Sequence, residues 1–261
     1  MKIPFYKYQG TGNDFILIDN RSLLLSKDDN AIIQKLCDRK FGIGADGLMF
    51  LQNINGFDFE MLYYNSDGRE SSMCGNGGRC IVKFAQLLGI AKDKYTFMAI
   101  DGEHEASILS YGEVSLKMKD VLLPTTVSTD YEMNTGSPHF VRFVTGVKEL
   151  DVVSLGRAIR YSAIYSEQGI NVNFVEILPD NSLFVRTYER GVEGETLSCG
   201  TGVVAAAIAY HLNSTEQPTS VHIHTIGGAM EVRFMREDHQ AVNVWLTGAA
   251  EMVYEGQIDW T

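Results

Sequence analysis

The segment SSMCGNGGRC, residues 71–80, places a cysteine directly before a glycine-rich run that leads into the apolar stretch IVKFAQLLGI. Residues 198–207, SCGTGVVAAA, repeat this arrangement 125 positions later. Both segments are typical of a turn that opens an α-helix. A helix N-terminus has unpaired backbone N–H groups and a partial positive charge, so it attracts anions and stabilises a cysteine thiolate. The sequence therefore predicts two reactive cysteines, Cys74 and Cys199, at two anion-binding turns.

The offset of 125 residues relates further positions in the two halves of the chain. The aligned identities are, in pairs, Phe15 and Phe140, Gly44 and Gly169, Tyr63 and Tyr188, Glu70 and Glu195, Gly75 and Gly200, and Gly77 and Gly202. A constant register over such a length indicates a duplicated structural unit. We therefore expect two pseudo-symmetric lobes, each contributing one Cys-Gly-x-Gly turn to an active-site cleft between them.

Short strand patterns outnumber helix patterns, which predicts an α/β protein whose lobes are each a curved mixed or antiparallel sheet around a central helix. Residues 57–64 alternate between apolar and other side chains, and residues 95–109 and 220–234 are typical of hairpins. Residues 26–40 predict a helix capped by Ser26. The stretch after Cys199 is apolar nearly all round, which indicates a buried central helix.

Composition limits the classes of partner. The 261 residues are 45% hydrophobic and carry a net charge of -11, which suits a globular protein with one large domain or two smaller ones. Nucleic-acid binding draws on clustered Lys and Arg, so a small-molecule substrate is the better prediction. No stretch is typical of a signal peptide or a membrane span, so we expect a cytoplasmic protein with reduced thiols and no membrane partner.

The two turns suit removal of a proton next to a carboxylate. Their amides would stabilise the charge that develops on the carboxylate oxygens. One cysteine, as a thiolate, would remove the proton from one face of the carbon while the other, as a thiol, returns a proton to the opposite face. This chemistry inverts the stereocentre, and we expect it to need no cofactor and no metal.

Other motifs favour structural roles. Residues 42–47, GIGADG, match the Gly-x-Gly-x-x-Gly pattern of dinucleotide-binding proteins. That pattern lies between a strand and a helix, whereas this segment follows a predicted helix and precedes a strand, so we do not predict dinucleotide binding. His222 and His224 share a strand face without a third ligand, so we interpret them as exposed histidines. Cys37 and Cys80 are predicted core residues; Cys80 shares a helical face with apolar side chains at 84, 87 and 88.

Taken together, the motifs resemble those of the diaminopimelate epimerases, which are pyridoxal-independent amino-acid racemases. They occur in family order over nearly the whole chain: TGNDFILID, GIGADG, NSDGRESSMCGNGGRC, GSPHF, GINVNFV, RTYERG and ETLSCGTG. The resemblance implies interconversion of LL- and meso-diaminopimelate, on the route to lysine and peptidoglycan. It also implies a homodimer, with contacts around Tyr254, and lobes formed by residues 1–122 with 250–261 and by residues 123–249.

The resemblance assigns roles to individual residues. Cys74 and Cys199 are implied to be the acid/base pair, and His139 and Glu189 to lie beside them. The implied substrate-binding residues, for a diamino dicarboxylic acid, are Asn13, Asn65, Gly75, Asn76, Asn171, Glu189, Arg190, Gly200 and Thr201.

The chain departs from the family pattern at two positions. Ser137 stands where many members have asparagine, and Gly47 stands where some have glutamine. Two other classes of function remain open at this point. A proline or hydroxyproline racemase would share the thiols but lack donors for a second charged end, and a non-catalytic amino-acid-binding or thiol redox-switch protein would not invert a carbon.

Overall fold

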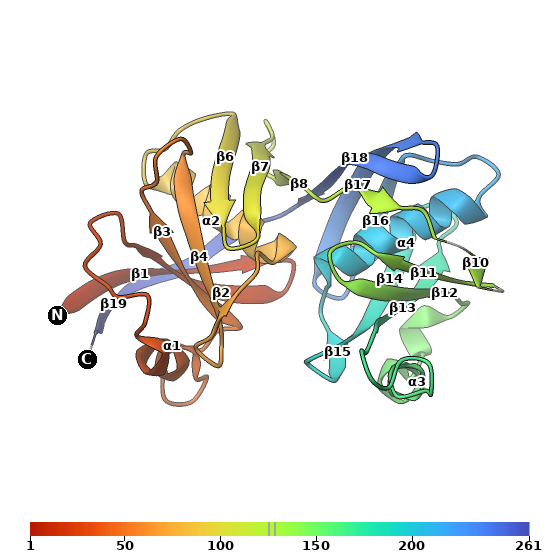
Figure 1. Cartoon of the computed structure of the whole chain (residues 1–261), viewed down its shortest axis with the longest axis horizontal. Coiled ribbons are helices and arrows are strands. Elements are labelled where there is room, and N and C mark those ends of the chain that lie inside the picture. The colour runs from red at the N-terminus through yellow and green to blue at the C-terminus, as the bar shows by residue number, and fades with distance from the viewer. Residues whose placement is uncertain (125, 128, 261) are drawn as a thin grey trace. The chain divides into compact units, whose positions relative to one another are not determined.

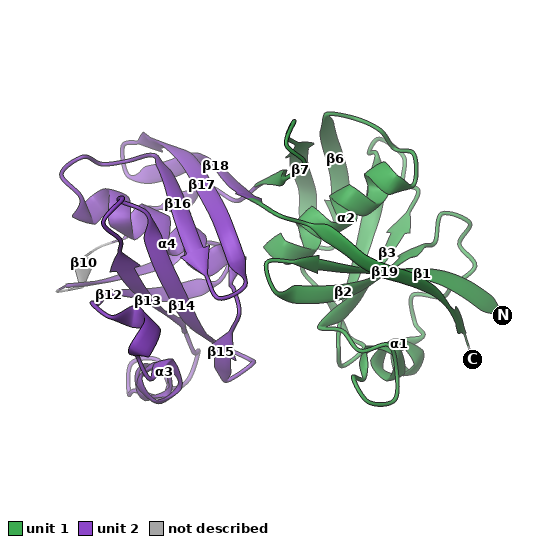
Figure 2. Ribbon diagram, turned by 180° about the vertical axis from the view of Figure 1, so that it is seen from behind, with its two compact units in different colours: residues 1–116, 248–261 green, residues 117–247 purple. Residues whose placement is uncertain are grey.

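The computed structural model describes residues 1–124, 126–127 and 129–260, and it divides into two compact units (Figure 2). Unit 1 comprises residues 1–116 and 248–261, and unit 2 comprises residues 117–247. Residues 248–261 belong to unit 1 because strand β19 (Glu251–Asp259) pairs antiparallel with β1 (Lys2–Gly10). No helix in the described part of the chain is long and apolar enough to cross a membrane.

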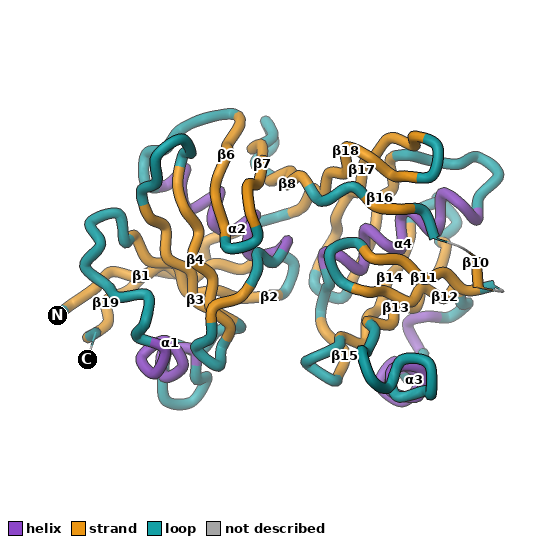
Figure 3. Tube along the Cα trace, viewed as in Figure 1, coloured by secondary structure: helices purple, strands orange, loops and turns teal. Residues whose placement is uncertain are grey.

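Each unit is built mainly of strands (Figures 1 and 3). Besides β1 and β19, the elements that begin in unit 1 are β2 (Asn13–Asp19), α1 (Asn30–Cys37), β3 (Gly47–Gln52), β4 (Phe59–Asn65), β5 (Glu70–Ser71), α2 (Gly75–Leu87), β6 (Lys94–Ala99), β7 (Gly102–Ile108) and β8 (Val114–Lys117). Those that begin in unit 2 are β9 (Val121–Leu122), β10 (Thr126–Val127), β11 (Asp130–Asn134), β12 (Pro138–Phe143), the 3-10 helix η1 (Val147–Glu149), α3 (Val152–Arg160), β13 (Asn171–Ile177), β14 (Leu183–Glu189), β15 (Gly194–Thr196), α4 (Gly200–Asn213), β16 (Ser220–Thr225), β17 (Gly228–Glu237) and β18 (Gln240–Gly248).

The two units repeat one strand topology. In unit 1, β2 pairs parallel with β3, β3 antiparallel with β4, and β4 parallel with β6. In unit 2, β12, β13, β14 and β16 pair in the same order and the same directions. Phe15 faces Gly47 in the first unit and Phe140 faces Val172 in the second, so the offset of 125 residues is kept there. The protein is therefore α/β with a duplicated mixed sheet, as the sequence predicts.

A central helix packs against the strands of each unit. Helix α4 packs on strands β11–β14, β16 and β17, and all residues from Gly202 to His211 are buried. Its small and branched side chains share one core cluster with apolar residues of those strands. In unit 1, α2 contacts β1, β2, β3 and β7. The apolar pattern after Cys199 thus correctly indicates a buried helix.

One local prediction, the Ser26 cap, is wrong, and two details differ from what the sequence pattern suggests. Helix α1 begins at Asn30 with Asp29 as its N-cap, whereas the Ser26 hydroxyl accepts a hydrogen bond from the backbone of Asp28 within a turn. Strand β4 is buried on both faces rather than one, because Leu62 and Tyr64 join the core cluster that includes residues of α1. Leu87, at the end of α2, is exposed.

Both predicted hairpins are confirmed. Ala99 pairs with Gly102 in the β6–β7 hairpin, and Thr225 pairs with Gly228 in the β16–β17 hairpin. Gly102 and Gly228 have φ values of 115° and 140°. This backbone region is open to glycine and costly for other residues, which explains the turn signals in the sequence.

Candidate functional site

In unit 1, Cys74 is the N-cap residue of α2 and has extended backbone angles. Its carbonyl accepts the first helical hydrogen bond, from the N–H of Gly78, at 2.7 Å. The residues from Gly75 to Arg79 are buried, while Cys74 itself is half-buried. A Cβ at Gly78 would lie 2.8 Å from the Met73 sulfur and 3.0 Å from the Leu116 side chain, so a larger residue would require these side chains to shift.

In unit 2, Cys199 occupies the equivalent position. It is the N-cap of α4, again with extended backbone, and its carbonyl accepts from the N–H of Val203 at 2.9 Å. Its Sγ lies 3.5 Å from Oγ1 of Thr201. Each cysteine therefore directly precedes the first turn of a helix, where backbone N–H groups have no acceptor within the helix.

His139 lies behind the Cys199 turn and is completely buried on β12. Its Nε2 is 2.8 Å from Oγ1 of Thr201, and its Nδ1 is 3.1 Å from Nδ2 of Asn173. Asn173 also donates to the carbonyl of Phe140 and accepts from the hydroxyl of Thr187. These contacts orient the Asn173 amide so that it donates to Nδ1, which leaves the imidazole proton on Nε2, directed at Thr201.

His139 is neutral. Burial, together with the positive charge of Arg190, lowers the pKa of His139 from 6.5 to about 3. A neutral imidazole with one proton on Nε2 donates to the Thr201 hydroxyl, and that hydroxyl lies in contact with the Cys199 sulfur. The arrangement can therefore direct a hydroxyl proton at the sulfur, which stabilises a thiolate.

Gly202 makes this arrangement possible. A Cβ at Gly202 would lie 2.4 Å from Oδ1 of Asn173 and 3.4 Å from the His139 ring. The glycine therefore lets α4 approach the buried His139 and Asn173 closely. In unit 1, a Cβ at the matching Gly77 would meet only the flexible end of Met49, at 3.1 Å.

A second cluster in unit 2 joins Asn171, Ser137 and Arg190. The Asn171 amide donates to Oγ of Ser137 at 2.9 Å, and its Oδ1 accepts from the backbone N–H of Arg190 at 2.9 Å. The Arg190 guanidinium lies 3.4 Å from the same Ser137 hydroxyl. Glu189, the last residue of β14, directly precedes Arg190 and is half-buried. The structure thus places Ser137 among the predicted binding residues Asn171 and Arg190.

In unit 1, Asn13 and Asn76 lie together. The Asn76 amide donates to Oδ1 of Asn13 at 2.6 Å, and the Asn13 amide donates to Asp46 at 2.8 Å. Asn65 has a different setting: it is exposed at the end of β4, and its backbone closes the turn to Gly68 and Arg69. Its turn role is visible in the structure.

Close packing explains why a glycine occupies position 47. A Cβ at this position would lie 2.5 Å from both the ring of Tyr63 and the carbonyl of Tyr64. The close approach of β3 and β4 therefore leaves no room for a side chain at this position.

Two further residues were not predicted from the sequence. Asn173, which holds His139, is two positions after Asn171 on one strand and therefore on the same face. The spacing of two residues from Asn171 could therefore have predicted that Asn173 faces the same site. Arg79, which is completely buried beside Asn76, follows the Cys74 turn in the sequence, but nothing in the local pattern indicates its burial.

The remaining cysteines are core residues, as predicted. Cys37 and Cys80 are buried, and burial raises the pKa of each thiol to about 12. These thiols are inert at neutral pH, because the thiolate is the reactive form.

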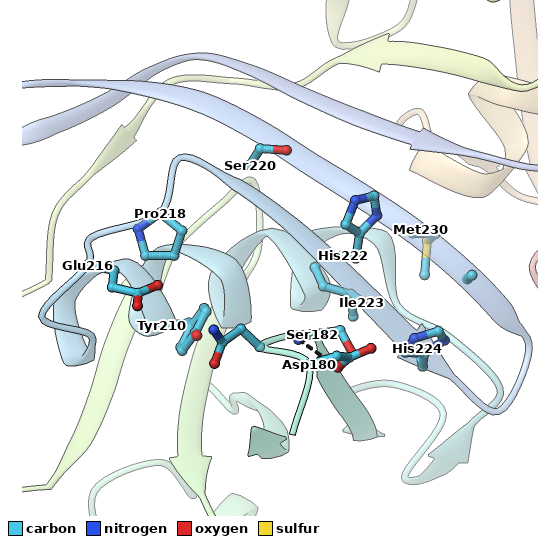
Figure 4. Close-up of a pocket in the computed structure, with 12 residues that line it drawn as sticks. Asp180, Ser182, Tyr210, Glu216, Pro218, Ser220, His222, Ile223, His224 and Met230 are labelled. Atoms are coloured by element: carbon cyan, nitrogen blue, oxygen red, sulfur yellow. Dashed lines mark hydrogen bonds between the residues drawn. The ribbon is translucent and has the colours of Figure 1, made fainter. Parts of the chain in front are cut away.

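A cavity of about 360 Å³ lies elsewhere in unit 2 (Figure 4). Tyr210 of α4 and His222 and His224 of β16 line it, together with the turn at residues 180–182. Tyr210 is ten residues beyond the start of α4, so the cavity lies roughly 15 Å along the helix from the Cys199 turn. In the described part of the chain, no three His, Cys, Asp or Glu residues are grouped to hold a metal ion.

Comparisons with known proteins bear on the whole chain. The family model for diaminopimelate epimerase matches residues 5–123 and 131–253. A diaminopimelate epimerase of Flavobacterium psychrophilum is 51% identical over 256 residues, covering 98% of this chain and 100% of the relative. One of Aquifex aeolicus is 39% identical over 279 residues, covering 98% of both chains.

Solved structures support the fold. A phenazine biosynthesis protein of the PhzF family from Bacillus anthracis superposes with a TM-score of 0.77 at 14% identity, covering 99% of both chains. A hydroxyproline epimerase from Agrobacterium vitis gives a TM-score of 0.68 at 14% identity, covering 98% of this chain and 92% of the other. Identities this low show a shared two-lobe architecture and nothing about substrate. The family match and the sequence relatives are decisive: the chain belongs to the diaminopimelate epimerase family.

Proposed function

We propose that this protein epimerises LL- and meso-diaminopimelate with Cys74 and Cys199 as its acid/base pair and without a cofactor. Family membership supplies the reaction and its place in lysine biosynthesis. The observation that carries the mechanism is that each unit makes a cysteine the N-cap of its central, glycine-initiated helix.

In the proposed reaction, one cysteine thiolate removes the proton from the α-carbon of the substrate. The carbon–hydrogen bond breaks, the proton passes to sulfur, and the electron pair is delocalised into the adjacent carboxylate. The thiol of the other cysteine then protonates the carbon from the opposite face and becomes a thiolate. The configuration is inverted, the total number of protons on the two sulfurs is unchanged, and the reverse reaction restores the starting state.

The N-terminal turns of α2 and α4 are proposed to bind the reacting carboxylate. Gly75 with Asn76, and Gly200 with Thr201, begin these helices, so their backbone N–H groups have no partner within the helix itself. Such donors stabilise the negative charge that builds up when the proton leaves. The mechanism requires both turns to bind the same substrate molecule.

Recognition of the rest of the substrate is proposed to fall to the other polar residues. Arg190 offers a planar fork for the distal carboxylate, and Glu189 offers a charge for an ammonium group. Asn13, Asn65 and Asn171 supply amide donors and acceptors. These residues could bind an ammonium and a carboxylate at each of two ends of a substrate. They therefore favour a diamino dicarboxylic acid over proline, which has only one such pair of charged groups.

His139 is proposed to act through Thr201. Because the imidazole is neutral and its Nε2 is directed at the Thr201 hydroxyl, it is suited to orient that hydroxyl toward the Cys199 sulfur. It would not itself take up the substrate proton, since burial strongly disfavours its charged form.

The cell compartment and assembly are part of the same proposal. A pair of catalytic thiols needs a reducing compartment, which the cytoplasm provides. A homodimer is proposed through β19, where the consecutive residues Met252, Val253 and Tyr254 are all exposed. Light scattering after size exclusion tests the dimer, and Tyr254→Glu should shift the measured mass to that of a monomer.

The decisive experiment follows LL-diaminopimelate in deuterated water with protein freed of metal and pyridoxal phosphate. The expected result is meso-diaminopimelate with one deuterium at the inverted carbon, detected by mass spectrometry and chiral chromatography. Proline and trans-4-hydroxyproline serve as control substrates and should not be inverted. Inversion without deuterium, or inversion of proline alone, would contradict the proposal.

A further inference from the structure

Arg79 is an unusual residue for the first turns of a helix, because its side chain is completely buried. In the described part of the chain, no carboxylate lies within 4 Å of its guanidinium group. Its shorter hydrogen bonds go to neutral acceptors: Oγ1 of Thr11 at 2.6 Å, Oδ1 of Asn76 at 3.0 Å and the carbonyl of Gly75 at 3.3 Å. The charge of Arg79 is therefore buried without an ion pair.

This placement is unfavourable for the fold taken alone. A buried cation without a counter-ion loses much of its hydration energy. The side chain also reaches back to Gly75, the first residue of α2, where the helix already carries a partial positive charge. Burial lowers the pKa of Arg79, whereas negative charge on the Cys80 and Cys74 thiols and on the Glu113 carboxylate acts in the opposite direction. An arginine nevertheless stays charged in proteins, so a positive charge lies behind the Cys74 turn.

The hydrogen bonds of Arg79 also define the direction of a polar chain. Arg79 can only donate, so Thr11 and Asn76 must accept from it through Oγ1 and Oδ1. The Asn76 amide then donates to Asn13, and the Asn13 amide donates to the Asp46 carboxylate, which can only accept. Because Arg79 can only donate at one end of this chain and Asp46 can only accept at the other, the side-chain amides of Asn76 and Asn13 each have a single possible orientation.

We propose that Arg79 is a positioning residue for the Cys74 turn: its buried charge favours the thiolate of Cys74, and its fork fixes the orientation of the Asn76 amide, which in turn holds Asn13. This inference rests on the proposed function. Arg79 does not contact the reacting carbon in it; it acts through Cys74, Asn76 and Asn13.

The other unit offers an internal comparison. At the offset of 125 residues, Arg79 corresponds to Val204, a buried core residue of α4. Behind the Cys199 turn lies the neutral His139 instead. An effect of Arg79 on thiol ionisation should therefore appear at Cys74 and not at Cys199.

A purely structural role would give a different result, so the test needs a readout other than activity. Iodoacetamide reacts with thiolates, and the rate of modification of each cysteine can be followed by peptide mass spectrometry as a function of pH. The variants are Arg79→Met, which removes the charge, and Arg79→Lys, which keeps it but loses the fork. Arg186→Met is the matched control, because Arg186 is a largely buried arginine of unit 2 that is paired with Glu195.

In Arg79→Met, the pH midpoint of Cys74 alkylation should rise by about one unit, as expected when a nearby opposite charge is removed. The Cys199 midpoint should stay unchanged. In Arg79→Lys the Cys74 midpoint should remain near that of the wild type, while KM rises because Asn76 and Asn13 lose their fixed orientation. Arg186→Met should lower thermal stability without moving either midpoint.

An unchanged Cys74 midpoint in folded Arg79→Met would overturn the proposal, as would equal shifts at both cysteines or an unaltered KM in Arg79→Lys. If Arg79→Met does not fold, Arg79→Gln, which keeps a donor but no charge, takes its place with the same expected shift. The alkylation profile does not depend on turnover. Failure of the wild-type protein to invert diaminopimelate would therefore contradict the proposed function and leave the alkylation test of Arg79 intact.

Discussion

The two cysteine turns share one backbone design but have different side chains behind them. In unit 1, the buried charged side chain of Arg79 packs beside the Cys74 turn. In unit 2, the neutral imidazole of His139 packs beside the Cys199 turn. The two units therefore share a cysteine at the N-cap of a glycine-initiated helix, while the side chains packed near these turns differ. Two equivalent helix starts need not hold two equivalent thiols.

The largest effects should come from removing either sulfur. Cys74→Ala and Cys199→Ala should each lower kcat for inversion by about 10³-fold or more, because each removes one of the two proton-transfer groups. Inversion of LL-diaminopimelate, measured by coupled assay or chiral chromatography, checks this. Substrate binding, measured by calorimetry, should persist in both variants. Near-normal turnover in either one would contradict a mechanism that needs both turns.

The matched glycines provide the next largest difference. Gly202→Ala should destabilise the protein by about 2 kcal/mol, because the new Cβ would lie 2.4 Å from the buried Asn173 amide. Gly77→Ala should cost less than about 1 kcal/mol, since the flexible Met49 side chain can move aside. Urea denaturation measures both. Equal losses would show that the two helix starts are packed alike.

Acid should affect the two units over different pH ranges. The pKa of His139 is about 3 in the fold against 6.5 when unperturbed, so the unfolded chain binds this proton first and stability falls as pH drops from about 6.5 towards 3. The slope for one proton is about 1.4 kcal/mol per pH unit. His139→Gln should remove it, as measured by urea unfolding between pH 7 and 4.

In unit 1, Asp14 is a carboxyl group that is sensitive to a lower pH range. Burial opposes ionisation, but hydrogen bonds from Arg39 and Lys7 outweigh it and lower the pKa of Asp14 from 3.8 to about 2. Its contribution is therefore complete above about pH 4 and is lost as pH falls towards 2. Asp14→Asn should leave the pH 4 to 7 slope unchanged, and a changed slope there would contradict this division between the units.

The smallest effect is expected at Ser137. Ser137→Ala removes the hydroxyl that accepts from Asn171, at a cost of about 1 kcal/mol in orientation of the binding residues. KM for diaminopimelate should rise about fivefold, the equivalent of that free energy, with kcat nearly unchanged. Ser137→Asn, which keeps a hydrogen-bond acceptor for Asn171, is the control and should keep KM near the wild-type value. A selective fall in kcat in Ser137→Ala would place the hydroxyl in the chemical step.

Sequence alone determined the features that depend on neighbouring residues. The glycines after Cys74 and Cys199 mark helix starts, the turn glycines Gly102 and Gly228 mark hairpins, and the apolar run of α4 indicates its burial. The duplication was also visible, because a constant offset survives in the sequence even where identities are few. The start of α1 was missed, since Asp29 lacks a side-chain capping bond and so gives no distinct local signal.

Only the tertiary structure decided which polar residues meet. The local sequence predicts a surface arginine at position 79. Arg79 is buried instead, because the packing of α2 on β1 and β2 brings Thr11 and Asn76 together, and these two residues accept its hydrogen bonds. His139 is neutral because it is completely buried and lies under the positive charge of Arg190, and both conditions come from residues distant along the chain. A charge or a proton responds to every group around it in space, and a linear pattern records only those that are adjacent along the chain.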